Sequence, residues 1–253
     1  MKKTSNMLMA ILVFALTIFV FNGTSILLSY VSVFFGVLLR GESGVSDTYY
    51  YLLGHQNLYS FLIYFTAFVL FALWYYFAVI QPRGLKPFLK ARTEGLSPAC
   101  FGWILLLAFA VQHLTSLVFT LIDMFSPAAV ENYSQMVETS GLTEYSFVWF
   151  LSTLILPPLT EEIIFRGLLL GYLKKTGIPF LAANLIQAVC FGIYHQNLAQ
   201  GIYTALLGFL LGYLAQRYGT LIAPMFLHFL YNLFGTVLVD LENAFLPAAG
   251  QGL

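Results

Sequence analysis

The residues of this chain that could do chemistry are concentrated in one short stretch, residues 160–166, which contains Glu161, Glu162 and Arg166. These charges stand inside an apolar run, 147–173, that is long enough to cross a bilayer as a helix. Charge at membrane depth is costly and persists mainly where it pairs, lines a wet cavity or takes part in a reaction. The stretch is therefore a candidate functional site.

Helical spacing gives the two glutamates different surroundings. Glu162 and Arg166 are four residues apart and share a helix face, so they can form an ion pair. At 3.6 residues per turn, Glu161 lies about 100° around the helix from Glu162 and about 140° from Arg166. We predict that Arg166 neutralises Glu162 and leaves Glu161 to face another group.

Two further polar pairs occur later in the chain, each with a spacing of four residues. Phe191 and His195 form the first pair, and His228 and Asn232 form the second. Either pair alone is typical of residues that merely hydrogen-bond and pack membrane helices together. Their chemical interest depends on whether they meet Glu161.

The composition indicates that a membrane positions these residues. The chain is 60% hydrophobic and 9% charged, whereas soluble domains average roughly 45–50% and 25%. Its formal net charge is zero, so no basic surface is available to neutralise phosphates and no nucleic-acid partner is expected. Cys100 and Cys190 fall in or beside apolar runs and are predicted to be reduced, buried thiols.

Seven apolar stretches predict an all-α, polytopic transmembrane helix bundle that forms a single membrane domain over residues 1–253. The predicted spans are 7–39, 58–80, 101–122, 147–173, 179–195, 201–215 and 221–239. The first is far longer than the core of a signal peptide, so we expect a retained span that is kinked or extends beyond the membrane. The alternative is a re-entrant hairpin that turns at Asn22-Gly23. Gly-x-x-x-Gly spacings at Gly167 and Gly208 predict close helix packing.

The distribution of positive charge predicts the orientation. With a cytoplasmic N-terminus, the cytoplasmic segments hold nine of the eleven basic residues, namely Lys2, Lys3, Arg83, Lys86, Lys90, Arg92, Lys174, Lys175 and Arg217. Arg40 would lie outside and Arg166 within the membrane. This bias agrees with the positive-inside rule. We therefore predict a multi-pass protein of the cell membrane with the acidic connection 123–145 outside.

The rise of a helix places the polar groups at comparable depths. At about 1.5 Å per residue, Glu161, His195, His228 and Asn232 lie roughly 14–24 Å from the cytoplasmic ends of their spans. Helix tilt accommodates a spread of about 10 Å. All four side chains can therefore share one layer inside the membrane.

Taken together, the three motifs resemble those of a known family. Glu-Glu-x-x-x-Arg, Phe-x-x-x-His and His-x-x-x-Asn, in this order on separate membrane helices, are similar to the motifs of the CPBP intramembrane proteases. That family includes the type II CAAX prenyl endopeptidases and bacterial Abi or bacteriocin-immunity proteins. The resemblance covers about residues 147–239, the expected catalytic core, and the first three spans show no matching motif.

The resemblance implies an intramembrane endopeptidase that hydrolyses a peptide bond in a membrane-associated protein or peptide, prenylated proteins being one class. Glu161 matches the glutamate that activates water, and His195 matches the histidine that shares this task. His228 and Asn232 match the groups that stabilise the tetrahedral oxyanion. These roles agree with general chemistry, because amide hydrolysis needs a base for water, an acid for the amine and donors for the oxyanion.

The resemblance leaves the need for a metal open. Glu162 and Arg166 match the remaining motif positions, which we interpret as structural support. Glu161, His195 and His228 together offer three ligands, the number that a catalytic zinc uses with water as the fourth. The ligands would come from three separate helices, and the compact His-Glu-x-x-His arrangement is absent from the sequence. We therefore expect a Glu161/His195-activated water with no required cofactor, and zinc as the alternative.

Two other classes of function are alternatives to a protease. In a transporter or proton-coupled carrier, Glu161, His195 and His228 would relay protons or bind an ion. No inverted repeat is apparent, although Pro157-Pro158 interrupts the fourth span just before the site. A non-catalytic immunity or scaffold protein could retain the same fold. The expected partners are the lipid bilayer and, for a protease, a protein or peptide substrate.

Overall fold

The structure is a computed structural model that describes residues 2–93, 95–142 and 145–238. Every regular element in these ranges is helical, which confirms the all-α prediction. The predicted end of the seventh span at Val239 and the C-terminal segment predicted to lie outside the membrane are beyond the described residues.

The α-helices follow the predicted spans and add shorter helices between them. Their bounds are α1 Lys2–Arg40, α2 Ser43–Leu53, α3 Gln56–Tyr75, α4 Leu85–Thr93, α5 Pro98–Phe125, α6 Pro127–Thr139, α7 Phe147–Trp149, α8 Leu156–Glu161, α9 Leu170–Lys175, α10 Phe180–Tyr194, α11 Leu198–Tyr218 and α12 Ile222–Leu233. Wider or tighter helical turns continue several of them at Tyr76–Ile80, Gln81–Arg83, Phe150–Ile155, Glu162–Leu169 and Phe234–Leu238. Through two of these segments, α7, α8 and α9 form one helix, Phe147–Lys175, which we call the site helix.

Five helices in the described ranges are long and apolar enough to cross a membrane. They are Lys2–Arg40, Gln56–Arg83, Pro98–Phe125, Phe147–Lys175 and Leu198–Tyr218. Two shorter apolar helices, Phe180–Tyr194 and Ile222–Val237, occupy the positions of the fifth and seventh predicted spans. Each predicted span therefore corresponds to a helix, and the polytopic membrane bundle is confirmed.

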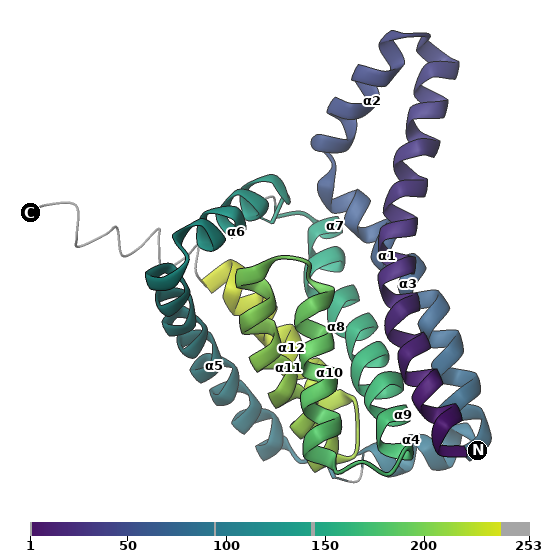
Figure 1. Cartoon of the computed structure of the whole chain (residues 1–253), viewed down its shortest axis with the longest axis vertical. Helices are drawn as coiled ribbons and strands as arrows, with labels where there is room; N and C mark the ends of the chain where they lie inside the picture. Colours follow the sequence, from purple (N-terminus) through teal and green to yellow (C-terminus); the bar gives the residue numbers. More distant parts are fainter. Residues whose placement is uncertain (1, 94, 143–144, 239–253) are drawn as a thin grey trace, which may run out of the picture.

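The site helix occupies the centre of the bundle. About 61% of its most apolar stretch is buried inside the protein, against 17% for each of the first three long helices. In Figure 1, α1 and α3 lie on one side of it, while α10, α11 and α12 lie on the other side and α5 lies beyond them. The helix that carries the charged residues is therefore the one most shielded from lipid.

The first helix passes through Asn22-Gly23 without a break, so the re-entrant alternative is wrong. With 39 residues, α1 is roughly 58 Å long, whereas the hydrocarbon core of a bilayer is about 30 Å thick. The helix is therefore long enough for the predicted extension beyond the membrane. An isolated glycine is tolerated in a long helix at a modest cost, and the neighbouring apolar residues continue the helical pattern.

The chain turns at Gly41 instead, and α2 folds back along α1 to form a projecting hairpin (Figure 1). Gly41 has a φ of +67°, a conformation that glycine adopts without steric cost. The two helices approach closely, because a Cβ on Gly36 would lie only 2.6 Å from the carbonyl oxygen of Gly44. At the tip, Arg40 Nη1 lies 3.0 Å from Asp47 Oδ2.

Glycine also allows α10 and α11 to pack closely, as predicted for the spacing that begins at Gly208. A Cβ on Gly208 would lie 3.0 Å from Cδ1 of Phe191, and one on Gly212 would overlap Oδ1 of Asn184. At the other spacing, Gly167 is also closely packed, because a Cβ there would lie 2.8 Å from Cε2 of Tyr75. The prediction fails only at Gly171, where a Cβ would meet nothing within 4 Å.

We expect Gly212→Ala to destabilise the protein by about 1–3 kcal/mol through overpacking. Asn184 cannot move aside freely, because its Nδ2 donates to the Phe209 carbonyl at 2.9 Å and its Oδ1 accepts from Gln187 at 2.8 Å. The measurement is the midpoint of thermal unfolding in detergent. Gly171→Ala is the matched control and should leave the midpoint unchanged or slightly raised, because alanine favours a helix and its Cβ would meet nothing within 4 Å. Equal midpoints for the two variants would contradict the predicted clash.

Candidate active site

The site helix is irregular around Glu161 because of two prolines. Pro157 and Pro158 have no backbone N–H, so the Thr153 carbonyl loses the donors four and five residues ahead of it. Asn232 on α12 replaces them, with its Nδ2 3.1 Å from the Thr153 oxygen. Wide π-helical turns flank this region at Phe150–Ile155 and Glu162–Leu169, and such turns are frequent at functional sites.

The predicted ion pair within the charged stretch is present and fully buried. Arg166 Nη1 donates to Glu162 Oε1 at 2.9 Å, and both side chains have 0% exposure. Arg166 Nη2 donates to the Gly208 carbonyl at 3.1 Å, and the guanidinium carbon lies 4.4 Å from the ring centre of Phe191. Arg166 therefore neutralises Glu162, as predicted, and ties the site helix to α10 and α11.

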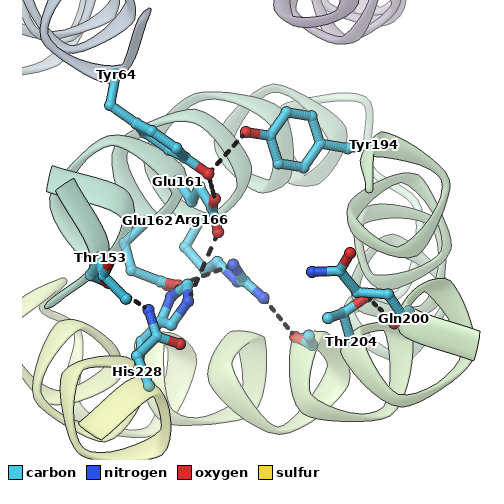
Figure 2. A network of polar contacts seen from close by, with 11 residues as sticks. Tyr64, Thr153, Glu161, Glu162, Arg166, Tyr194, Gln200, Thr204 and His228 are labelled. Atoms are coloured by element: carbon cyan, nitrogen blue, oxygen red, sulfur yellow. Dashed lines mark hydrogen bonds and ion pairs between the residues drawn. The ribbon is translucent and has the colours of Figure 1, made fainter. Parts of the chain in front are cut away.

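His228 contacts both glutamates. Its Nδ1 lies 2.9 Å from Glu162 Oε1, and its Nε2 lies 3.6 Å from Glu161 Oε2. Because an ionised carboxylate only accepts hydrogen bonds, Nδ1 is assigned as the donor to Glu162. This bond fixes the imidazole orientation and directs Nε2 toward Glu161 (Figure 2).

Glu161 faces a tyrosine from outside the three motifs. Tyr64 on α3 donates its hydroxyl to Glu161 Oε1 at 2.7 Å, and the Tyr194 hydroxyl donates to the Tyr64 oxygen at 3.2 Å (Figure 2). The other carboxylate oxygen of Glu161, Oε2, is buried without a hydrogen-bond partner among the described residues. Sequence reasoning missed Tyr64, because a single tyrosine in an apolar span carries no spacing signal.

The four residues predicted to be catalytic line one cavity of about 700 Å³. They are Glu161, His195, His228 and Asn232. The cavity has the size of pockets that enclose small ligands or short segments of larger ones. The predicted convergence of the three motifs inside the membrane bundle is therefore confirmed, while the role of each residue is a separate question.

His195 lies directly after α10 and enters the cavity beside Phe191. The ring centres of Phe191 and His195 are 5.0 Å apart, and those of Phe191 and His228 are 5.9 Å apart. Nε2 of His195 is buried and has no hydrogen-bond partner within the described part of the chain. Phe191 therefore contacts both imidazoles, and an unpaired ring nitrogen remains for a ligand or water.

The three candidate zinc ligands come from separate parts of the bundle: Glu161 ends α8, His195 follows α10, and His228 lies in α12. Within residues 2–93, 95–142 and 145–238, no three His, Cys, Asp or Glu side chains are grouped closely enough to hold a metal ion. Glu161 Oε2 and His228 Nε2 approach each other to 3.6 Å. The need for a metal stays a prediction, with the Glu161/His195-activated water as the expectation and zinc as the alternative.

Comparisons with known proteins agree with the motif region. Residues 143–234 match the family model described as type II CAAX prenyl endopeptidase Rce1-like. A curated protein of Bacillus subtilis (strain 168), named "Putative membrane peptidase YdiL", is 38% identical over 89 residues, which are 35% of this chain and 35% of that protein. The alignment thus spans about a third of the relative's length. No solved structure matches the chain. The family match confirms, for residues 143–234, the resemblance to the CPBP intramembrane proteases, and this relative agrees with it.

Proposed function

We propose that this protein is an intramembrane endopeptidase that cleaves a protein or peptide with a water molecule activated by Glu161. The observation that carries the proposal is the approach of Glu161 and His228, 3.6 Å apart, inside a cavity that His195 and Asn232 also line. The family match over residues 143–234 supports the same class of reaction.

In the proposed reaction, Glu161 accepts a proton from water at Oε2. That oxygen has no hydrogen-bond partner among the described residues, whereas Oε1 is held by Tyr64. The water oxygen bonds to the scissile carbonyl carbon, and the carbonyl oxygen becomes an oxyanion. When the C–N bond breaks, the proton passes from Glu161 to the leaving nitrogen. One water is consumed, and the products are a carboxylic acid and an amine.

His195 is assigned to orient the attacking water. Its buried Nε2 lacks a partner in the part of the chain that the structure describes, and the ring lines the same cavity as Glu161. A histidine ring nitrogen without a partner can still make one hydrogen bond, as donor or acceptor depending on the tautomer of the ring. It can therefore hold the water while Glu161 removes the proton.

His228 and Asn232 are assigned to the oxyanion. Nδ1 of His228 donates to Glu162, and Nε2 faces the cavity beside Glu161, where it donates to the oxyanion when it carries a proton. Asn232 uses one N–H on the Thr153 carbonyl, and its amide has a second N–H. Donors directed at the developing negative charge are usually a large part of catalysis in acyl transfer.

The test is cleavage of peptides by the purified protein in liposomes. Membrane-associated peptides, with and without a prenyl group, are incubated with the wild-type protein and with Glu161→Ala, and the products are identified by mass spectrometry. New termini that require Glu161 would support the protease and would also identify the substrate. Proton or ion flux in the same liposomes without any cleavage would favour the transporter instead.

We expect purified, active protein to contain far less than one zinc per chain. The reason is that the three candidate ligands come from separate helices and that the compact His-Glu-x-x-His arrangement of many zinc proteases is absent from the sequence. Elemental analysis of the purified protein measures the metal, and prolonged chelation should leave cleavage unchanged. Stoichiometric zinc, with activity lost on its removal and restored on its addition, would establish the metalloprotease alternative.

A further inference from the structure

The fold separates basic and acidic residues to opposite ends of the bundle. At one end, Asn6 Nδ2 donates to the Lys175 carbonyl at 3.2 Å, so the N-terminal lysines lie beside the end of the site helix. Arg83, Lys174 and Lys175 line one hollow at this end. We call it the basic end, and it lies at the bottom of Figure 1, where the N-terminus and α4 are.

The opposite end carries acidic residues. Figure 1 shows α6 and the α1–α2 hairpin there. The acidic residues that the structure describes in these elements and at the end of α5 are Glu42, Asp47, Asp123, Glu131 and Glu138. The one described basic residue among them, Arg40, is paired with Asp47. By the positive-inside rule the basic end faces the cytoplasm, so the α6 end faces the other side of the membrane.

The cavity that contains Glu161 extends toward the α6 end. Its lining includes Tyr133, Ser134 and Val137 of α6 and Ser140 just after it. Ser134 is exposed, so the cavity reaches the protein surface there. The cavity therefore connects the candidate active site to the end of the bundle that we assign to the extracytoplasmic side.

Toward the basic end the site is closed. The hollow there, of about 490 Å³, has Arg166 and Gly167 in its lining and shares no lining residue with the Glu161 cavity. Between the two lies the buried pair of Glu162 and Arg166, which is held further by the Gly208 carbonyl. Opening this region would separate a buried ion pair, which is strongly unfavourable.

The lining also restricts what can enter. Glu161 is its one acidic residue, and it holds no lysine, arginine or aspartate among the residues described. Hydroxyl and amide side chains line much of the wall, among them Asn57, Gln112, Thr115 and Thr204. Burial raises the pKa of the Tyr133 phenol above its ordinary value, so that group stays neutral at physiological pH. A charged side chain would find no partner of opposite sign there except the catalytic groups.

We propose that the substrate reaches Glu161 from the extracytoplasmic face, as a peptide segment without charged residues next to the scissile bond. The proposal rests on the proposed function, which it narrows to segments that are presented outside the cytoplasm. Cytoplasmic protein tails, prenylated tails included, would meet the closed end of the site. Exported peptides and the external ends of membrane proteins have access to the open end.

The side of entry is tested by thiol labelling, which does not require any cleavage. In a Cys100→Ser/Cys190→Ser background, Ser134→Cys and Ser60→Cys both report on the mouth of the cavity, since Ser134 is exposed and Ser60 is partly exposed near the start of α3. Lys86→Cys on α4 is the control at the basic end, where its side chain is exposed. Intact cells are treated with a small, charged thiol reagent, and the same reagent is then added after permeabilisation.

We expect Ser134→Cys and Ser60→Cys to be labelled in intact cells at least about tenfold more than Lys86→Cys, because the bilayer excludes a charged reagent. Permeabilisation should then expose Lys86→Cys. Labelling of Lys86→Cys in intact cells, with the two cavity positions protected until permeabilisation, would overturn the proposal. So would equal labelling at all three positions.

A second arm separates this inference from the proposed function. Peptides identified as substrates are added outside sealed vesicles of either orientation, and a lysine is placed on each side of the scissile bond in a matched peptide. Cleavage should occur in right-side-out vesicles. Its rate should fall at least about tenfold for the peptide with the added lysines, since an unpaired charge in a membrane cavity is costly. If neither orientation cleaves any peptide, the protease fails while the labelling still decides the open side. Cleavage confined to inverted vesicles would refute the entry side alone.

Discussion

Glu161→Gln is expected to abolish peptide cleavage while leaving the protein folded. Glutamine keeps the shape of the side chain and an oxygen that can accept the Tyr64 hydroxyl, which now lies 2.7 Å from Glu161 Oε1. It cannot take a proton from water. Loss of a general base lowers a rate by about 10²–10⁴-fold, and the initial rate of peptide cleavage in liposomes measures the effect.

The control for this variant is Glu138→Gln on α6, which makes the same chemical change at an exposed side chain. Its cleavage rate and its unfolding midpoint should equal those of the wild type. Glu161→Gln should share the midpoint but not the rate, because its side chain keeps its packing. Retained cleavage by Glu161→Gln would remove Glu161 from the reaction.

Arg166→Ala is expected to lower the stability of the protein by about 3–5 kcal/mol, the usual cost of removing one partner of a buried ion pair. The substitution leaves the fully buried Glu162 carboxylate without its cation. It also removes the donor to the Gly208 carbonyl and the contact with the Phe191 ring. Folded yield and the midpoint of unfolding in detergent are the measurements.

Two further variants separate charge from packing at this site. Arg217→Ala removes an exposed arginine near the end of α11 and should change the stability by no more than about 0.5 kcal/mol. The double variant Arg166→Met/Glu162→Gln removes both charges of the buried pair and should be more stable than Arg166→Ala, because no unpaired charge is left. If Arg166→Ala is as stable as Arg217→Ala, the buried pair does not support the fold as proposed.

Local rules explain why much of the fold was predictable from the sequence. Membrane spanning follows from the length of apolar runs, and the pair of Glu162 and Arg166 follows from the spacing of residues on one helix. The motif order and the similar depths of Glu161, His195 and His228 in their spans predicted that these side chains could meet. The structure confirms that they line one cavity.

Asn232 and the first helix show the limit of those rules. Asn232 was predicted as a site residue because it lies four residues after His228. Its hydrogen bond to the Thr153 carbonyl, however, depends on two prolines in a different helix. The sequence also left open a turn at Asn22-Gly23, whereas the chain turns at Gly41. In each case the deciding contact joins segments whose relative position no local pattern specifies.

The contact of Tyr64 with Glu161 was determined by the tertiary structure alone. Tyr64 stands 97 positions before Glu161 in the chain, in a span without any recognisable motif, and it donates to the Glu161 carboxylate only because α3 packs against the site helix. The open and closed ends of the cavity were decided in the same way, by α6 at one end and by Arg166 between Glu162 and Gly208 at the other. Residue types and helical spacing determined which groups could react, and the packing of helices distant in sequence determined what each group contacts and from which side it is reached.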